Sequence, residues 1–311
     1  MSWIYSDAFF FAIVLQTAPL LLAALGGMFS QQANVLNIAL DGMMLMGAFV
    51  SIAIGAKTGS TLVATLAAGA SGLLIALVFG FTSLFLGADL VVVGIGIGTL
   101  TAGISVFLLS TIYHNEGSYS PRNFPELWKI QLGPLKHIPV LGPAFEGQSI
   151  LVLLAVVLVP VSSYVLYHTR YGLRVRAVGE EEAAAVAAGL NPRRLKMSTV
   201  MISGVLCGIA GGQLAMATLG QFISGMTAGR GFIALAAIFV GRARPVGTMV
   251  GCLVFGLVSA LANELQIHHL NSDLMLMLPY VVTVLVLVAR PAVQTVRRRR
   301  QAALVSAAST A

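Results

Sequence analysis

Residues 170–196 read RYGLRVRAVGEEEAAAVAAGLNPRRLK, the densest cluster of charge in a chain with little charge elsewhere. Apolar runs long enough to cross a bilayer lie on both sides of this stretch. A polar loop with a short helix of its own, held between two spans, presents a preorganised element to the aqueous phase. The stretch therefore predicts a membrane protein whose exposed loop contacts a soluble partner.

Composition sets the class of the fold. Of the 311 residues, 58% are apolar and 9% are charged, whereas soluble domains carry about 25% charged residues. The 33 glycines suit closely packed transmembrane helices. With about 20 residues per span, the chain has room for eight to ten crossings. We expect an all-α polytopic membrane protein in which residues 1–311 form a single transmembrane domain.

Nine apolar segments are the predicted spans. The segments at about 37–55 and 230–241 contain glycine or are short, and they are candidates for broken or re-entrant helices, which need protein or a water-filled cavity around them. The nine segments lie at about 9–29, 37–55, 61–86, 90–112, 149–168, 196–219, 230–241, 246–265 and 273–290.

The basic residues predict the orientation. No Lys or Arg precedes Lys57, whereas the loop at about 170–196 holds six and the segment after residue 289 holds five. The positive-inside rule then makes that loop and the basic tail at about 291–311 cytoplasmic. The net charge of +7 fits this topogenic role, so no nucleic-acid partner is expected. Contact of the tail with anionic headgroups is the alternative.

The loop at about 113–148 is expected on the external face. It contains five prolines, which oppose a long helix. The loop either covers a pathway or meets an external partner, or it is a lid without a specific role.

A short cytoplasmic helix is predicted from Glu180 to Ala188. Three acids at its start favour the positive end of the helix dipole, and the alanines that follow are strong helix formers. Gly189 fits the position after the helix, and Asn191-Pro192 prevents its continuation. Such a helix either transmits force from a soluble machine or is a solvated connector.

The loop carries a family resemblance. Arg176 to Gly179 (R-A-V-G), Ala188 to Asn191 (A-G-L-N) and the S-G-x-x-x-G-x-A-G-G span from Ser203 to Gly212 resemble the coupling region of ATP-binding cassette importer permeases. The branch in question serves simple sugars, branched-chain amino acids and nucleosides. The resemblance implies that a cytoplasmic ATPase contacts this loop, through the residues Gly179, Glu180, Glu181, Glu182, Ala184 and Gly189.

Two further segments are similar to the nucleoside-type members of the same branch. Asn37 to Phe49 resembles their "NIGLEGMMLIGAF" stretch, and Ala228 to Ala237 resembles their "GRGFIALA" segment. The likeness spans about residues 17–290. Gln31-Gln32 replaces the usual acid-base pair, Asp41 replaces a Glu, and the external loop matches loosely. Nucleosides are the expected substrate, with simple sugars and branched-chain amino acids as alternatives.

The resemblance implies a permease subunit in the inner (plasma) membrane of a bacterial cell. Two such subunits, identical or different, would enclose the path, and an external binding protein would deliver the substrate. ATP would be used by the partner subunits, and no cofactor is expected on this chain. Gly55-Ala56-Lys57-Thr58 lacks the glycine spacing of a Walker A loop, and Ala210-Gly211-Gly212-Gln213, although similar to an ATPase signature, lies within an apolar span. We expect close helix packing there, and no catalytic centre.

Asn37, Asp41, Gly42 and Arg230 are the candidate residues of the substrate pathway. An ionisable group within a span is costly and usually faces the bundle interior or an aqueous cavity. Asn37 would share a face with Asp41 if this segment were helical. The alternatives are that Asp41 pairs with buried backbone or an arginine to fix the fold, and that Arg230 is an interfacial anchor.

Other classes of function fit the sequence less well. An ion-coupled transporter needs membrane acids in repeated halves, and no second half reproduces the Asp41 motif. A membrane enzyme needs a His, Ser or carboxylate constellation, which we do not find. His268 and His269 have no partner at metal-ligand spacing, so no metal site is expected.

Overall fold

The computed structural model describes residues 7–115, 117–122, 124–125, 127–129, 145–267 and 277–285, and these are almost entirely helical. The elements are α1 (Asp7–Gln32), α2 (Leu40–Thr58), α3 (Thr61–Gly80), η2 (Phe81–Phe85), α4 (Leu90–Tyr113), β1 (Ser118–Tyr119), α6 (Ile150–His168), α7 (Arg170–Glu180), α8 (Glu182–Ala187), α9 (Pro192–Gln213), η4 (Leu214–Leu219), β2 (Phe222–Ile223), α10 (Arg230–Val240) and α11 (Pro245–Ile267).

Seven helices in the described residues are long and apolar enough to cross a membrane: α1, α2, α3 with η2, α4, α6, α9 with η4, and α11. The predicted all-α polytopic fold is confirmed. The predicted segment at 230–241 forms the shorter apolar helix α10. The last predicted segment, at 273–290, is described at 277–285, where it is helical. The basic tail at 291–311 lies outside the described residues.

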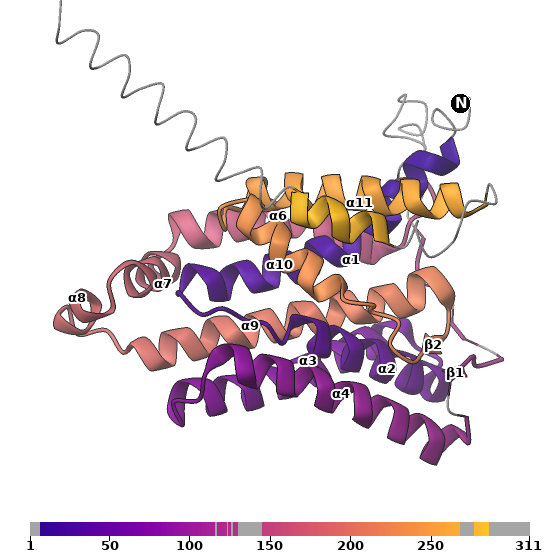
Figure 1. The fold of residues 1–311 in the computed structure, drawn as a ribbon, viewed down its shortest axis with the longest axis horizontal. Helices are drawn as coiled ribbons and strands as arrows, with labels where there is room; N and C mark the ends of the chain where they lie inside the picture. Colours follow the sequence, from indigo (N-terminus) through magenta and orange to yellow (C-terminus); the bar gives the residue numbers. More distant parts are fainter. Residues whose placement is uncertain are drawn as a thin grey trace, which may run out of the picture.

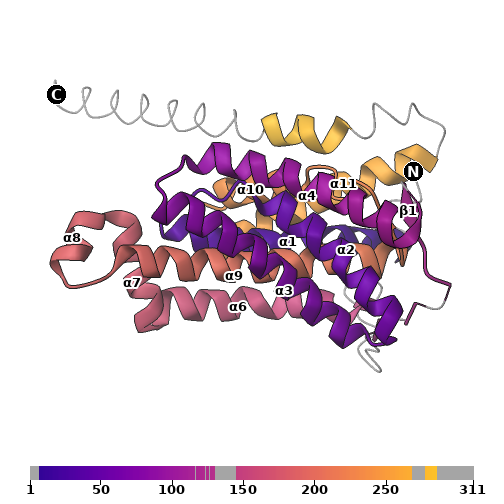
Figure 2. The same ribbon diagram turned by 90° about the horizontal axis from the view of Figure 1, so that it is seen from below.

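The long helices lie side by side, and the polar connections gather at the two ends of the bundle (Figures 1 and 2). Helices α7 and α8 project beyond the spans at one end. Strands β1 and β2 lie at the other end, where they pair antiparallel and join the loop after α4 to the segment after η4. The two loops therefore lie on opposite sides of the bundle, as the positive-inside argument requires.

Helix α9 forms the centre of the bundle and packs on α1, α2 and α3. Its glycines permit contact between backbones: a Cβ on Gly208 would lie 2.9 Å from the carbonyl carbon of Ala68, and one on Gly211 would lie 2.6 Å from that of Met44. Small residues allow such approach when no water is present to drive association. The sequence-based interpretation of Gly211 and Gly212 as packing residues agrees with this geometry.

Two interruptions place helix N-termini inside the bundle. Residues 33–39 are not helical, and Figure 1 shows this connector running from the end of α1 back along the bundle before α2 begins. Residues 224–229 form turns before α10, which ends at a tight turn leading into α11. The segment predicted at 37–55 is therefore not broken, because residues 33–39 precede the continuous helix α2, and residues 224–229 precede the segment at 230–241, which forms the short helix α10.

Candidate functional site

The loop at 170–196, which is predicted to be cytoplasmic, contains two helices, not one. The prediction of a single helix from Glu180 to Ala188 was wrong, because Glu181 has an extended backbone (φ −150°, ψ 102°) that separates α7 from α8. Helix α7 already begins at Arg170, so the first half of the charged loop is helical as well. The element is an elbow, with one arm packed on the spans and the other arm projecting.

The packed arm, α7, contacts the bundle through one face. Gly172, Val175 and Val178 are buried at intervals of three residues, which places them on the same side of the helix. The Tyr171 hydroxyl lies 2.8 Å from that of Ser198 on α9. Burial raises the pKa of the Tyr171 hydroxyl, and the contact with Ser198 opposes that shift. The packing ties α7 to the central helix.

Gly179 fixes the end of α7 against the end of α1. A Cβ at this position would overlap the carbonyl oxygen of Gln32 and lie 3.0 Å from its carbonyl carbon. These are backbone atoms, which cannot rotate away as a side chain can. Gly179, a predicted coupling residue, is thus the residue through which α7 contacts the end of α1.

We expect Gly179→Val to move α7 off the end of α1 and to impair coupling. ATP hydrolysis stimulated by substrate should fall in the assembled transporter, while the amount of inserted chain stays close to wild type. Gly103→Val is the matched control, because a Cβ on Gly103 of α4 meets nothing within 4 Å. Equal activities of the two variants would contradict the role assigned to Gly179.

The projecting arm, α8, is held at its ends. Glu182 forms an ion pair with Lys196 of α9, with 2.6 Å between Oε2 and Nζ. At the other end, Gly189 has φ +79°, its N–H donates to the carbonyl of Val186 (2.9 Å), and the N–H of Leu190 donates to that of Ala185 (3.0 Å). This pair of hydrogen bonds is a Schellman motif, so the predicted position of Gly189 is confirmed.

The surface of α8 faces water. Ala185 is buried, whereas Glu181, Glu182 and Ala184 are exposed. Val186, also on α8, is 54% exposed, and Leu173 on α7 is 61% exposed. The elbow thus offers acidic groups and two uncovered apolar side chains at the end of the molecule.

Asp41 connects the two helices that begin inside the bundle. It lies in the first turn of α2, and its carboxylate accepts hydrogen bonds from the N–H of Gly231 and the hydroxyl of Thr227, each at 3.0 Å. Gly231 is in the first turn of α10, where a negative charge is favoured by the helix dipole. One carboxylate therefore lies in the first turn of α2 and accepts hydrogen bonds at the N-terminal end of α10.

The other predicted pathway residues point in different directions. Residue 37 precedes α2, so Asn37 and Asp41 are not on one face of a regular helix. The Asn37 amide nitrogen donates to the Ser203 hydroxyl of α9 (3.0 Å), and the side chain is 1% exposed. Gly42 packs on α4, where a Cβ would lie 2.7 Å from the Thr101 hydroxyl oxygen. Arg230 donates to the carbonyl of Met226 (2.9 Å).

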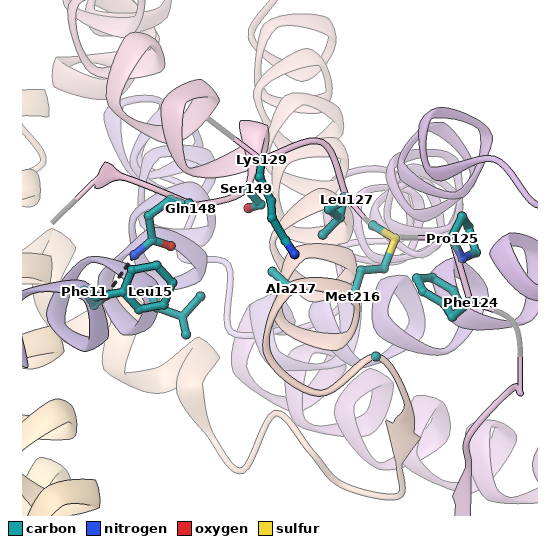
Figure 3. A pocket seen from close by; sticks show the side chains of 12 residues that line it. Phe11, Leu15, Phe124, Pro125, Leu127, Lys129, Gln148, Ser149, Met216 and Ala217 are labelled. Carbon is teal, nitrogen blue, oxygen red and sulfur yellow. Dashed lines mark hydrogen bonds between the residues drawn. The ribbon is translucent and has the colours of Figure 1, made fainter. Parts of the chain in front are cut away.

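At the opposite end of the bundle, a cavity of about 230 Å³ lies between α1, η4 and the described part of the loop at 113–148 (Figure 3). Phe11 and Leu15 of α1, Phe124 of the loop and Met216 of η4 contribute apolar walls. The Gln148 amide nitrogen donates to the carbonyl of Phe11 (2.8 Å), which ties the start of α6 to α1. The loop thus lies over the ends of the spans.

Sequence reasoning missed Gln32, Thr227 and Gly231. Gln32 lies under Gly179, and its amide nitrogen also donates to the carbonyl of Ala243 (2.6 Å) in the α10–α11 turn. The signal for Gln32 was its place in the Gln31-Gln32 pair, where the resembled family has charged residues. Gly231 lay within a recognised motif, but no local pattern pairs it with Asp41.

The chain matches known membrane transport proteins over most of its length. Residues 9–287 match the family described as "Branched-chain amino acid transport system / permease component". The chain is 36% identical over 288 residues to the guanosine ABC transporter permease protein NupQ of Bacillus subtilis, covering 89% of each protein. It is 33% identical over 286 residues to the nucleoside ABC transporter permease protein NupC of Lactococcus lactis, covering 88% of this chain and 89% of the relative.

A third relative is named for a different substrate. The chain is 33% identical over 263 residues to a putative glucose ABC transporter permease protein of Haloferax volcanii, covering 84% of this chain and 79% of the relative. No solved structure gives a significant match. Permeases of this kind are multi-pass plasma membrane proteins. Membership of the family implies an ATPase and a substrate-binding protein as partners. With the match over residues 9–287 and these relatives, the chain belongs to the permease component family of branched-chain amino acid type ABC transport systems.

Proposed function

We propose that this chain is a permease subunit of an ATP-driven nucleoside importer. Two permease subunits enclose the path, a cytoplasmic ATPase contacts the elbow formed by α7 and α8, and an external binding protein delivers the nucleoside. The chain carries no ATPase site and binds no cofactor, so ATP is hydrolysed by the partner subunits. Closure of the ATPases shifts the population between inward- and outward-facing states.

The observation that carries this proposal is the set of contacts between the elbow and the spans α1 and α9. Helix α7 rests on α1 at Gly179 and on α9 at Tyr171, and α8 is paired with α9 through Glu182 and Lys196. A displacement of α8 is therefore transmitted to the first and the central spans. The two relatives named for guanosine and nucleosides support the choice of substrate.

Reconstituted uptake tests both the mechanism and the substrate. The chain, its ATPase and its binding protein are placed in vesicles, and radiolabelled guanosine, glucose and leucine are supplied in turn. We expect ATP-dependent accumulation of guanosine that persists when the proton gradient is collapsed. Preference for glucose or leucine would overturn the substrate, and uptake that needs the gradient and not ATP would overturn the mechanism.

A further inference from the structure

A basic cavity beside the elbow has no part in the function proposed above. It has a volume of about 530 Å³ and lies between α6, α7 and the turn from α10 to α11. Three arginines line it, Arg176 on α7 with Arg242 and Arg244 on the turn, against the single carboxylate of Glu180. The cavity is of a size that holds small ligands, and its charge selects anions.

Arg176 is held in place by its surroundings. The Arg176 guanidinium lies 5.0 Å above the centre of the Tyr167 ring, and its Nε is buried without a hydrogen-bond partner among the described residues. The stacking on Tyr167 fixes the plane of the guanidinium at the wall of the cavity. Planar guanidinium groups suit phosphate oxygens, which accept two parallel hydrogen bonds from each group.

The turn that carries the other two arginines has an unusual backbone. Arg242 and Ala243 are consecutive non-glycine residues with positive φ angles, +55° and +50°. Backbone of this kind persists only where neighbouring contacts impose it, and it is concentrated at functional sites. Here the Gln32 amide holds the carbonyl of Ala243, and a Cβ on Gly241 would lie 2.5 Å from the carbonyl carbon of Gly247. The turn thus presents both arginines to one cavity.

The surface next to the cavity indicates what kind of phosphate-bearing ligand fits there. Below its rim, toward the middle of the spans, α6 and α11 expose Tyr164 (63%), Val156 (38%) and Val250 (52%), and Val156 lines an apolar cavity between these two helices. Exposed tyrosines at the end of a span and exposed valines deeper in it are the surface that a bilayer covers. Acyl chains could lie along these side chains while a headgroup enters the cavity. Basic pockets between spans on the cytoplasmic side are known to suit anionic lipid headgroups.

We propose that this cavity binds the phosphate of an anionic phospholipid from the cytoplasmic leaflet. The lipid bridges α7 to the α10–α11 turn, and so it links the elbow to α10, whose first turn is hydrogen-bonded to Asp41. The alternative source of the same chemistry is a soluble phosphate, which needs no acyl chain against α6 and α11.

Native mass spectrometry of the assembled transporter tests this assignment. The complex is released from nanodiscs of mixed phosphatidylcholine and phosphatidylglycerol, and retained lipids are counted for the wild type and for Arg242→Gln/Arg244→Gln. Each arginine near an anionic headgroup contributes roughly a fivefold factor, so affinity for phosphatidylglycerol should fall about thirtyfold. If the double variant does not assemble, Arg244→Gln alone should weaken retention about fivefold.

Arg193→Gln/Arg194→Gln is the matched control. It removes the same charge at the same end of the molecule, from exposed positions on α9 that do not line the cavity. We expect it to retain phosphatidylglycerol as the wild type does. Equal retention by both double variants and the wild type would show that these arginines act in topology alone. Displacement of the lipid by inorganic phosphate or ATP, to the same extent in the wild type and in Arg193→Gln/Arg194→Gln, would overturn the lipid assignment in favour of a soluble ligand.

Discussion

Gly189→Pro is expected to abolish substrate-stimulated ATP hydrolysis while the chain still inserts into the membrane. Proline fixes φ near −65°, whereas Gly189 has φ +79°. Proline also lacks the N–H that donates to Val186, so the Schellman motif that ends α8 is lost. Forcing a residue into a backbone conformation that it cannot adopt costs on the order of 1–3 kcal/mol, and a six-residue helix is too short to be stable without its end contacts.

The control for this change is Gly189→Asn. Asparagine adopts the left-handed conformation more readily than other non-glycine residues and keeps the N–H. It should retain most of the stimulated ATP hydrolysis. Both variants are compared as the rate per assembled complex in reconstituted vesicles. Full stimulation in Gly189→Pro would show that α8 does not transmit the signal from the ATPase.

Asp41→Ala is expected to lower the yield of folded complex sharply. The change leaves the N–H of Gly231 and the hydroxyl of Thr227 without their shared acceptor in the bundle interior. Leaving a buried neutral donor without its acceptor costs roughly 1–3 kcal/mol, and two such donors are left here. The α2–α10 junction should loosen, and thermal stability and yield of the purified transporter should both fall.

Asp41→Asn distinguishes a structural role from contact with substrate. The amide keeps the volume and one oxygen that accepts from Gly231, so assembly should recover to a large extent. Uptake of radiolabelled nucleoside per folded complex is the quantity to measure. If Asp41 fixes the junction, that value stays close to wild type in Asp41→Asn. A loss of uptake in both variants, with normal assembly, would place the carboxylate on the substrate path.

The end of the cytoplasmic element could be predicted from the sequence, whereas its interior could not. Gly189 and Asn191-Pro192 act through local backbone chemistry, and the structure has Gly189 in the left-handed conformation with Asn191 capping α9. Glu181 has no such signal, since acids followed by alanines favour a continuous helix. The break there follows from tertiary anchors, Gly179 on Gln32 and Glu182 on Lys196, which orient the two arms differently.

The burial of the pathway candidates could likewise be predicted from the sequence only in part. A carboxylate within a span indicated that Asp41 has a buried role, and the structure gives it buried partners. Those partners lie far along the chain, and no periodicity links them to residue 41. The burial of Asn37 against Ser203 likewise depends on the non-helical connector at 33–39, whose path is set by packing on α9 and not by a local turn motif.

The junction at Asp41 also imposes an order on biogenesis. The carboxylate leaves the ribosome 186 residues before Thr227 and 190 residues before Gly231. At about 5–20 residues per second, the first helices wait roughly 10–40 s for these donors. During that interval an acid in the bilayer has no permanent partner, a state that insertion scales place at about 2.5–3.5 kcal/mol above a neutral span. A nascent chain that stops before residue 227 therefore keeps this acid in the bilayer without either of its donors.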